Sequence, residues 1–462
     1  MQFQSVRKMA TARIPVWAIV LGAWVLSAQN APKPASARDP DGTLAQVREK
    51  LATLVRRLPR YTCVQTVDRQ YFGLSHRMNA QSLPAASCDR IIENRKNGSD
   101  TPKLEATDRL RLEVAVSNGH EIYSWANSSE FDSRQIHQIV GEGATSTGEF
   151  GTFLSDIFDN PGTKFSYERE ASAGGRALLE FSYRVPVQAS HYRVRADLGL
   201  GQGADSWHTT GYEGSFSIDP ESMELVRLTI QTDRLPPTTE ICQATTALEY
   251  QRVRIGAEDV LLPRSSQLHI VSRNARETIN VTTFSGCRQY GAESTLRFGD
   301  EPADANSGGK DAAAARVPLP AWLPITLALV APIDTGAAAA GDLVTARVAQ
   351  AVRAPNSKTI LVPAGATVLG RITTMEHHLT PKNYFLIGMA FDTLEVNGVA
   401  SPFHALLDVK HESVLQIEVS ESRPEPPKTG ALFPFSTKQD RLVVPVGYKT
   451  MWVTGRLPDA KR

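Results

Sequence analysis

Residues Gly211 to Leu228 read G-Y-E-G-S-F-S-I-D-P-E-S-M-E-L-V-R-L and begin a run of alternating apolar and polar residues that continues to Phe298. The alternation is clearest where Val226, Leu228 and Ile230 are separated by Arg227 and Thr229. A period of two predicts a half-buried strand, and Asp219-Pro220 predicts a turn between two strands. The stretch therefore predicts a meander of antiparallel strands, around which the rest of the chain is organised.

The meander departs from this alternation in two places. The phase slips from Leu248 and Tyr250 to Val253 and Ile255, and from Ile279 and Val281 to Phe284. Because a shift of one residue moves side chains to the other face, each slip predicts a bulge or a strongly bent strand. A bent sheet with one apolar face also needs a cover.

A helix predicted from Thr43 to Leu58 is the best candidate for that cover. Its apolar residues at Leu44, Val47, Leu51, Leu54, Val55 and Leu58 have the spacing of one helical face. Between the helix and the meander we expect further strands, at Tyr61 to Phe72 and around Leu112. Tight turns are predicted at Asn118-Gly119 and Gly174-Gly175, and a short helix is predicted over residues 146–159.

The inward positions of the predicted strands carry aromatic and aliphatic side chains. They are Phe165, Tyr167, Phe181, Tyr183, Phe216, Leu228, Ile230, Leu248 and Tyr250. Such residues either line an acyl-chain groove or fill a core, because any half-buried sheet shows this alternation.

The N-terminus carries an export signal. Arg7, Lys8 and Arg13 precede the apolar run from Ile14 to Leu26, and small and polar residues follow it. The run is shorter than the roughly 20 residues that cross a bilayer, so it predicts a signal peptide over residues 1–28. An uncleaved anchor stays open as the alternative. After cleavage we expect a disordered, proline-containing leader (29–41), no transmembrane segment, and a place in the periplasm or cell envelope.

The charge composition argues against one class of partner, and the cysteines predict disulfides. Without the first 28 residues the chain carries 47 basic and 49 acidic residues, and a balance so close to neutral argues against a nucleic-acid-binding protein. Four cysteines, Cys63, Cys88, Cys242 and Cys287, predict two disulfides in an oxidising compartment. Three pairings are possible. We favour Cys63 with Cys88 and Cys242 with Cys287, although a regular meander would keep the latter two apart.

The composition changes to a linker at residues 299–317, and a second β region follows over residues 318–456. Strands are expected near 325–331, 342–352, 358–362, 366–375, 384–394, 401–410 and 441–454. Residues 421–440 are rich in proline and predict a loop that is exposed or folded over these strands.

Two resemblances extend this prediction. The motifs R-Y-T-C-V-Q-T-V-D-R (60–69), G-E-F-G-T-F-L-S-D-I-F (148–158) and T-F-S-G-C-R-Q-Y (283–290) resemble a group of exported acidobacterial proteins without assigned function. F-S-I-D-P-E-S (216–222), after a single helix, is loosely similar to the fold of outer-membrane lipoprotein-sorting proteins. That resemblance implies a half-barrel that holds acyl chains under a helical lid.

The second resemblance concerns the C-terminal region. G-D-L-V-T-A-R-V (341–348) and I-L-V-P-A-G-A-T-V-L-G-R (360–371) resemble the β-barrel domain of TrbI-like conjugation and type IV secretion channel proteins. The amphipathic membrane-crossing helices of that family are not evident in this sequence, so only the barrel is carried over.

Motifs for catalysis or metal binding are weak. The densest group of candidate ligands is Glu376, His377, His378, His404 and His411. Neighbours on a strand point to opposite faces, so His377 and His378 cannot ligate one metal ion from one side. Asp219 and Glu221 flank a proline in a predicted turn, and the run from Gly199 to Gly203 has no helix after it to bind phosphate. The sequence shows no nucleophile elbow and no phosphate-binding loop.

The sequence therefore predicts a mainly β protein. An α+β N-terminal domain (42–298) would form a helix-covered bent sheet or half-barrel, and a small β-barrel domain (318–456) would follow. We expect a non-catalytic envelope protein without a cofactor, which binds lipid or lipoprotein acyl chains in the half-barrel. The alternative is a structural or assembly module that contacts envelope proteins through its C-terminal domain.

Overall fold

The structure is a computed structural model that describes residues 39–57, 60–73, 87–99, 101–117, 120–128, 131, 135–140, 143–196, 206–289, 319–407 and 430–455. The predicted signal peptide, most of the predicted leader, the linker, the turn at 118–119 and the glycine run at 199–203 lie outside these residues. Pro40 to Arg462 forms one compact unit. Within the described ranges, no helix has the length and apolarity needed to cross a membrane.

The described residues of the N-terminal half form twelve strands, the 18-residue helix α1 and several shorter helices. Its elements are α1 (Pro40–Arg57), β1 (Tyr61–Gly73), α2 (Cys88–Lys96), β2 (Lys103–Ser117), β3 (His120–Trp125), α3 (Ile136–Val140), α4 (Thr152–Leu154), the π-helical turn η2 (Ser155–Asp159), β4 (Lys164–Ala173), β5 (Arg176–Val185), η3 (Val187–Ala189), β6 (Arg193–Ala196), β7 (Ser206–Thr209), β8 (Tyr212–Asp219), β9 (Glu224–Thr232), η4 (Pro237–Thr239), β10 (Ile241–Ile255), β11 (Glu258–Ser272) and β12 (Glu277–Gln289).

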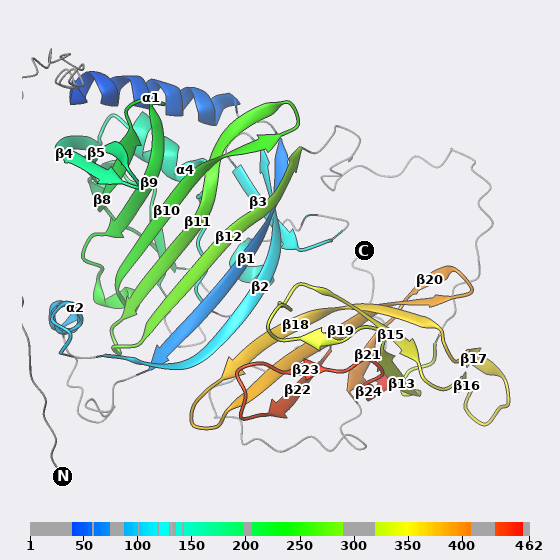
Figure 1. Ribbon diagram of the computed structural model, residues 1–462. Coiled ribbons are helices and arrows are strands. Elements are labelled where there is room, and N and C mark those ends of the chain that lie inside the picture. The colour runs from blue at the N-terminus through cyan, green and yellow to red at the C-terminus, as the bar shows by residue number, and fades with distance from the viewer. Residues whose placement is uncertain are drawn as a thin grey trace, which may run out of the picture. The chain divides into compact units, whose positions relative to one another are not determined.

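These strands confirm the predicted mainly β class and the meander. Antiparallel ladders join them in the order β4-β5-β8-β9-β10-β11-β12-β1-β2-β3. From β8 to β12 the chain pairs each strand with the next, as the alternation predicts. The first strand β1 lies between β12 and β2 (Figure 1). The sheet is large and open.

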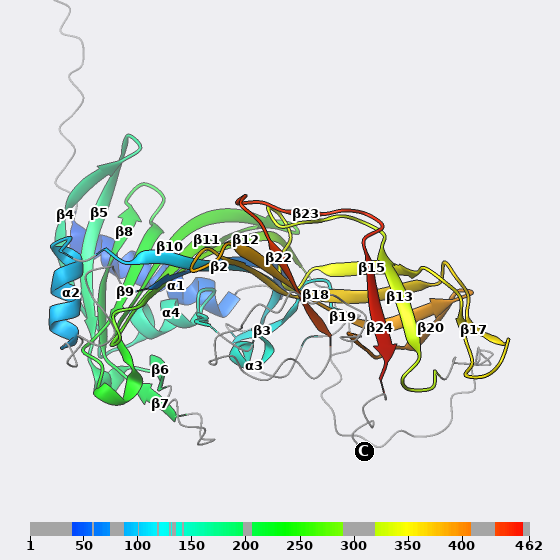
Figure 2. The ribbon, with the colours of Figure 1, turned by 90° about the horizontal axis from the view of Figure 1, so that it is seen from below.

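Helix α1 covers one face of this sheet. Figure 2 shows the sheet curving round α1 and α4, and the side chains of Val47 and Leu51 on α1 are buried in one hydrophobic cluster with Phe158 and Phe216. The helix begins at Pro40, so the predicted leader is wrong at its last two residues. Proline fits the first turn of a helix because the N–H that it lacks has no partner there.

One predicted bulge is confirmed and the other is wrong. The register of β10 against β11 shifts between Glu249 and Tyr250, at the first predicted slip. β12 instead stays regular past the second: Thr282 and Phe284 are buried, and Val281 is 38% exposed. The prediction assumed that the apolar residue Val281 lies on the covered face of β12. That face instead carries the polar residues Asn280 and Thr282, so no phase slip is needed to bury Phe284.

The irregularity of β12 falls a few residues later and positions a disulfide. Between the pairs Thr62–Arg288 and Val64–Ser285, the single residue Cys63 opposes Gly286 and Cys287. Gly286 has a φ of 58°, a left-handed conformation that glycine adopts without a steric cost. The bulge therefore brings the Cα atoms of Cys63 and Cys287 to 4.1 Å, and these two cysteines form a disulfide.

The favoured disulfide pairing is thus wrong. Cys63 pairs with Cys287 and Cys88 pairs with Cys242, in place of Cys63–Cys88 and Cys242–Cys287. The cause is topological: β1 lies beside β12, while α2 packs at the start of β10, where its Ile91 shares a small core with Val271. The objection that the meander separates Cys242 from Cys287 was correct.

The C-terminal region contains the remaining strands. They are β13 (Pro324–Leu329), β14 (Ile333–Asp334), β15 (Leu343–Val348), β16 (Val352–Arg353), β17 (Ile360–Val362), β18 (Thr367–His378), β19 (Tyr384–Val396), β20 (Val399–Pro402), β21 (Ala405–Leu407), β22 (Ala431–Ser436), β23 (Val443–Val444) and β24 (Lys449–Thr454). Each predicted strand range overlaps at least one of them. Ladders run in the order β22-β19-β18-β15-β13-β24-β21, and one isolated parallel bridge joins Leu406 to Gly430.

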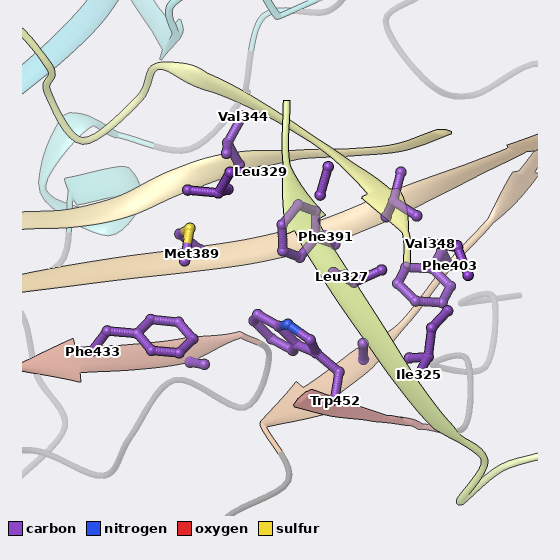
Figure 3. Close-up of a cluster of buried hydrophobic side chains, with 14 of the residues drawn as sticks. Ile325, Leu327, Leu329, Val344, Val348, Met389, Phe391, Phe403, Phe433 and Trp452 are labelled. Carbon is purple, nitrogen blue, oxygen red and sulfur yellow. The ribbon is translucent and has the colours of Figure 1, made fainter. Parts of the chain in front are cut away.

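The core of these strands is centred on Trp452. Its side chain is fully buried, its ring lies 5.2 Å from that of Phe391, and Phe433 also contacts it (Figure 3). The indole N–H donates a 2.7 Å hydrogen bond to Thr450 Oγ1, so this large aromatic side chain is buried without an unmatched donor.

The proline-rich loop prediction is wrong over Ala431 to Ser436, which form β22 and pair with β19. Ala431 and Phe433 of β22 belong to the buried core. Pro434 has no N–H to donate, and β19 is the only strand that forms a ladder with β22 in the described chain, so the proline lies on an edge strand. Residues 421–429 lie outside the described residues.

Strand β2 connects the two groups of strands. Its residues Ala106 to Asp108 pair with Glu376 to His378 of β18. Arg111 on β2 also donates hydrogen bonds of 2.5 Å to both carboxylate oxygens of Asp342. The predicted division into domains 42–298 and 318–456 remains a prediction.

Candidate functional site

The predicted ligand-lining residues gather on the face covered by α1, in what we term the α1 cluster. Its buried members are Val47, Leu51, Phe153, Leu154, Ile157, Phe158, Leu179, Phe181, Tyr183, Val185, Tyr212, Phe216, Ile218, Leu225, Leu228, Ile230, Leu248, Tyr250 and Leu261. Phe165 is partly buried against the cluster. Tyr167 is 39% exposed and meets the cluster only at its border, where its ring lies 5.5 Å from that of Phe181.

The aromatic rings of the α1 cluster are closely packed. Phe216 stacks on Phe181 with 5.2 Å between ring centroids, and Phe158 meets Phe216 edge-on at 5.0 Å. Tyr183 donates a 2.7 Å hydrogen bond from its hydroxyl to the carbonyl oxygen of Thr229. Most of the predicted lining residues therefore fill a core in this structure, under the cover of α1.

Polar contacts of two cationic side chains fix α1 on the cluster. Arg48 donates a 2.9 Å hydrogen bond from Nε to the carbonyl oxygen of Phe158, and its guanidinium lies 5.1 Å from the centroid of the Phe165 ring. Lys50 donates a 2.8 Å hydrogen bond from Nζ to the carbonyl oxygen of Ser222. Contacts of this kind near solvent each contribute about 1 kcal/mol or less, so they hold the helix without locking it.

A buried polar cluster adjoins the α1 cluster. Glu121 on β3 accepts hydrogen bonds from the hydroxyl of Tyr123 (2.6 Å) and from the backbone N–H groups of Gly148 (2.7 Å) and Phe150 (2.9 Å). Burial raises the pKa of Glu121, while these hydrogen bonds oppose the rise. Glu121 therefore anchors the segment that leads into α4 to the sheet.

Glu149 lies in the same segment and is less well satisfied. It is 1% exposed, and Oε1 accepts a long hydrogen bond of 3.4 Å from Ser266 on β11. Burial, with a smaller contribution from the nearby charge of Glu121, raises the pKa of Glu149 to about 7, although a hydrogen bond with the side chain of Ser146 opposes the rise. Among the described residues its Oε2 has no hydrogen-bond partner.

Sequence reasoning missed this polar cluster. Glu121 and Tyr123 stand two residues apart in a short strand, and their partners across the hairpin are Val116 and Val114. The sequence did contain one signal for Glu121. Residues that pair across two strands lie on the same face of the sheet, so an acid paired with the core residue Val116 should itself lie on the covered face. Glu149 gave no such signal, since it lies in a turn outside the strands.

A hollow of about 830 Å³ lies on the same sheet, and five of its lining residues belong to the α1 cluster: Phe181, Phe216, Leu225, Tyr250 and Leu261. Its charged lining residues are Glu168, Arg169, Arg176, Glu180, Asp219, Glu224, Arg227, Glu249, Arg252 and Arg264. Glu168 and Arg264 fall at register shifts of β4 and β11, which bend the sheet here. Most arginines are ion-paired, as Arg169 is with Glu180 at 2.7 Å, so the hollow favours neither sign of ligand charge.

The remaining predicted candidates have local contacts. His377 contacts Asn383 at 2.9 Å and His378 contacts Glu376 at 2.7 Å, while His411 lies outside the described residues. The described part of the chain holds no group of three metal-ligating side chains. Asp219 accepts a 2.9 Å hydrogen bond from the backbone N–H of Glu221, which confirms the predicted turn.

Comparisons with known proteins add distant neighbours. No family model matches the chain, and no curated protein matches it. Among solved structures, a LolA superfamily protein from Nitrosomonas europaea is 7% identical, with a TM-score of 0.24 over 54% of this chain and 94% of that protein. A DUF1329 family protein from Desulfovibrio piger is 9% identical, with a TM-score of 0.23 over 55% of this chain and 94% of that one.

A third solved structure is similar to the same extent. A domain described as an outer membrane lipoprotein-sorting protein, from Vibrio parahaemolyticus, is 9% identical, with a TM-score of 0.23 over 53% of this chain and 90% of its own length. At such TM-scores the similarity identifies neither the fold nor a function of this chain.

Proposed function

We propose that the chain is a non-catalytic, exported protein of the cell envelope that holds an apolar ligand chain between α1 and the sheet. The ligand is an acyl chain of a lipid or a lipoprotein. One observation carries the proposal: a helix covers the apolar face of an open sheet, and polar contacts of Arg48 with η2 and of Lys50 with the turn between β8 and β9 help to hold it there.

The free energy gained by burying an acyl chain is large enough to replace the apolar contacts that α1 makes with the cluster. Fully burying side chains such as Val47 and Leu51 contributes roughly 1.5 to 3 kcal/mol each. An acyl chain gains about 0.8 kcal/mol per buried CH₂, so about a dozen methylenes gain about 10 kcal/mol. A ligand chain can therefore replace the contacts of α1, provided that the helix swings away from the aromatic side chains beneath it.

The test is the binding of an apolar fluorescent probe, phenylnaphthylamine, to the purified mature protein. Arg48→Ala removes the hydrogen bond to Phe158 and the contact with the Phe165 ring, so we expect it to speed probe uptake several-fold. Arg56→Ala is the matched control, because Arg56 lies on the same helix and is exposed. It should leave the uptake rate unchanged.

Two results would contradict the proposal. The first is a wild-type protein that binds no probe at any concentration below probe aggregation. The second is equal uptake by the Arg48→Ala and Arg56→Ala variants, since the helix would then not control access to the cluster.

A structural or assembly module of a cell-surface or secretion complex is the second candidate, favoured by one feature of the C-terminal strands. Val330, Val443 and Val446 are 40%, 50% and 63% exposed. The backbone N–H of Gly447 donates a 2.8 Å hydrogen bond to the carbonyl oxygen of Leu329. Val446 precedes Gly447 and Val330 follows Leu329, so these two valines lie near one another. Cross-linking in the native host should then recover an envelope protein joined to this region, and recovery of lipid alone would contradict this candidate.

A further inference from the structure

The strongest unexplained feature is a set of buried oxygen atoms beside the α1 cluster. The hydroxyls of Tyr61 and Tyr250 and the Oε2 atom of Glu149 have no hydrogen-bond partner among the described residues. Tyr61 is fully buried, Glu149 is 1% exposed and Tyr250 is 8% exposed. Buried polar atoms in folded proteins are nearly always hydrogen-bonded, so three unmatched ones near each other call for an explanation.

These atoms belong to one region of the interior. The carboxylate of Glu121 acts electrostatically on both Tyr61 and Tyr250, and that of Glu149 acts on Tyr250. The ring of Tyr61 packs edge-on against Phe150, 5.9 Å away, next to Glu149 in sequence. The unmatched groups therefore surround the acid pair rather than lying scattered through the core.

The same region borders the face that α1 covers. Tyr250 belongs to the α1 cluster, and Tyr61 belongs to the adjoining core with Phe150. Leu54 on α1 packs against both groups of buried residues. Withdrawal of α1 would thus uncover the apolar face and, at its border, the unmatched hydroxyls.

The chemistry of these groups is that of hydrogen-bond donors. Burial raises the pKa of Tyr61 and of Tyr250, so both phenols keep their protons at any physiological pH. Glu149, whose pKa burial raises to about 7, is protonated in a substantial fraction of molecules at neutral pH and then also donates. A free carboxylate of a ligand would face the negative charge of Glu121, whereas a neutral carbonyl oxygen would accept from the hydroxyls.

We propose that Tyr61, Tyr250 and Glu149 form a polar subsite that binds the carbonyl oxygens of an ester- or amide-linked acyl chain. This inference rests on the proposed function and narrows its ligand to acyl chains joined through a carbonyl. The hydrocarbon part lies along the α1 cluster, and the linkage lies at the hydroxyls. Free fatty acids and alkyl ethers are the weaker ligands, because the former bring a like charge and the latter lack the carbonyl acceptor.

The test compares two lipids that differ only in the carbonyl groups. The mature protein is titrated with dioleoylglycerol and with the matching dioleyl ether of glycerol, by displacement of phenylnaphthylamine. A neutral hydrogen bond of about 1 kcal/mol corresponds to about fivefold in affinity, so we expect the ester to bind about fivefold to tenfold more tightly. Tyr250→Phe should reduce this ratio severalfold without weakening ether binding.

Tyr384→Phe is the control, because Tyr384 lies on β19 and does not belong to the α1 cluster. It should keep the wild-type ratio. Tyr61→Phe gives a second variant if Tyr250→Phe does not fold. Equal affinities of the wild-type protein for the ester and the ether would contradict the subsite, because the hydroxyls would then make no hydrogen bond to the carbonyl oxygens. The proposed function would still stand, since both lipids would bind. Failure to bind either lipid would contradict the proposed function itself.

Discussion

At the scale of single residues, Glu121 and Glu149 show how one fold holds two neighbouring buried acids differently. Glu121 accepts three hydrogen bonds, two of them from backbone N–H groups, and so is largely satisfied. Glu149 accepts a long hydrogen bond from Ser266, and its Oε2 has no hydrogen-bond partner among the described residues. Of the two, Glu149 is therefore the group whose protonation should affect stability near neutral pH.

The first prediction concerns pH. The pKa of Glu149 is raised from 4.5 to about 7, so the folded chain keeps a proton that the unfolded chain releases between these values. Stability contributed by the protonated acid is fully present below pH 4.5 and is lost as pH rises toward 7. The difference of about 2.5 in pKa corresponds to at most about 3 kcal/mol in the free energy of unfolding.

Glu149→Gln should reduce the dependence of the free energy of unfolding on pH. Midpoints of urea unfolding, measured from pH 5 to pH 8, would show the reduction. Part of the slope should persist, because the pKa of Glu121 is also raised. The neighbouring tyrosines, Tyr61, Tyr123, Tyr192 and Tyr250, stay protonated throughout this range. Glu258→Gln, at an exposed position of β11, is the control and should keep the wild-type slope. An unchanged slope in Glu149→Gln would disprove the assignment.

Residues in strands could be predicted from the sequence where apolar and polar side chains alternate strictly. Phe181, Phe216, Leu228 and Leu248 were assigned to the covered face, and all four are buried there. The prediction failed at Val281, because the covered face of β12 carries polar side chains, among them Asn280 and Thr282. Which face of a strand is covered depends on the elements packed over it, and alternation alone does not contain that information.

At the scale of elements, α2 is a short helix that depends on its attachment. It has nine residues, and its ties to the rest of the fold include the Cys88–Cys242 disulfide, the packing of Ile91, and a 2.6 Å hydrogen bond from Arg95 to the carbonyl oxygen of Ala275. Ion pairs of Arg95 with Glu277 and of Asp89 with Arg234 add to them. Isolated helices shorter than about 12 residues are marginal in water. The disulfide is thus expected to determine whether α2 stays formed.

The second prediction follows from this attachment. In the double variant Cys88→Ser/Cys242→Ser, amide hydrogen exchange over residues 88–96 should speed up at least tenfold, while exchange in β10 and β11 changes little. Hydrogen exchange with mass spectrometry measures both. The variant Cys63→Ser/Cys287→Ser should leave exchange in α2 unchanged, since that disulfide joins β1 and β12. Equal protection of α2 in both variants would contradict the role of the disulfide.

The elements show where local sequence information ends. Helix α1 and the strands β8 to β12 follow from periodicity within each segment. The position of β1 between β12 and β2 does not, because it depends on strands more than 150 residues apart in the chain pairing with each other, and the disulfide pairing depends on it. Strand β22 was missed because its proline suggested a loop, although proline is tolerated on an edge strand.

At the scale of the whole molecule, the apolar face that α1 covers borders a group of buried oxygen atoms, which we propose as a polar subsite. The contacts of Arg48 and Lys50 hold α1 in place. In the function that we propose, the α1 cluster is the surface for hydrocarbon, and the hydroxyls of Tyr61 and Tyr250 are the donors for the linkage. The C-terminal strands, which β18 joins to β2, expose Val330, Val443 and Val446, the surface that the second candidate function would use.

The most direct measurement is the lipid content of the protein purified from its own host. Organic extraction followed by mass spectrometry should recover ester- or amide-linked acyl lipid at a ratio approaching one molecule per chain, and substantially less from the Arg48→Ala variant, whose covering helix is less firmly held. Recovery of no bound lipid, from a folded protein that also takes up no apolar probe, would contradict the central claim.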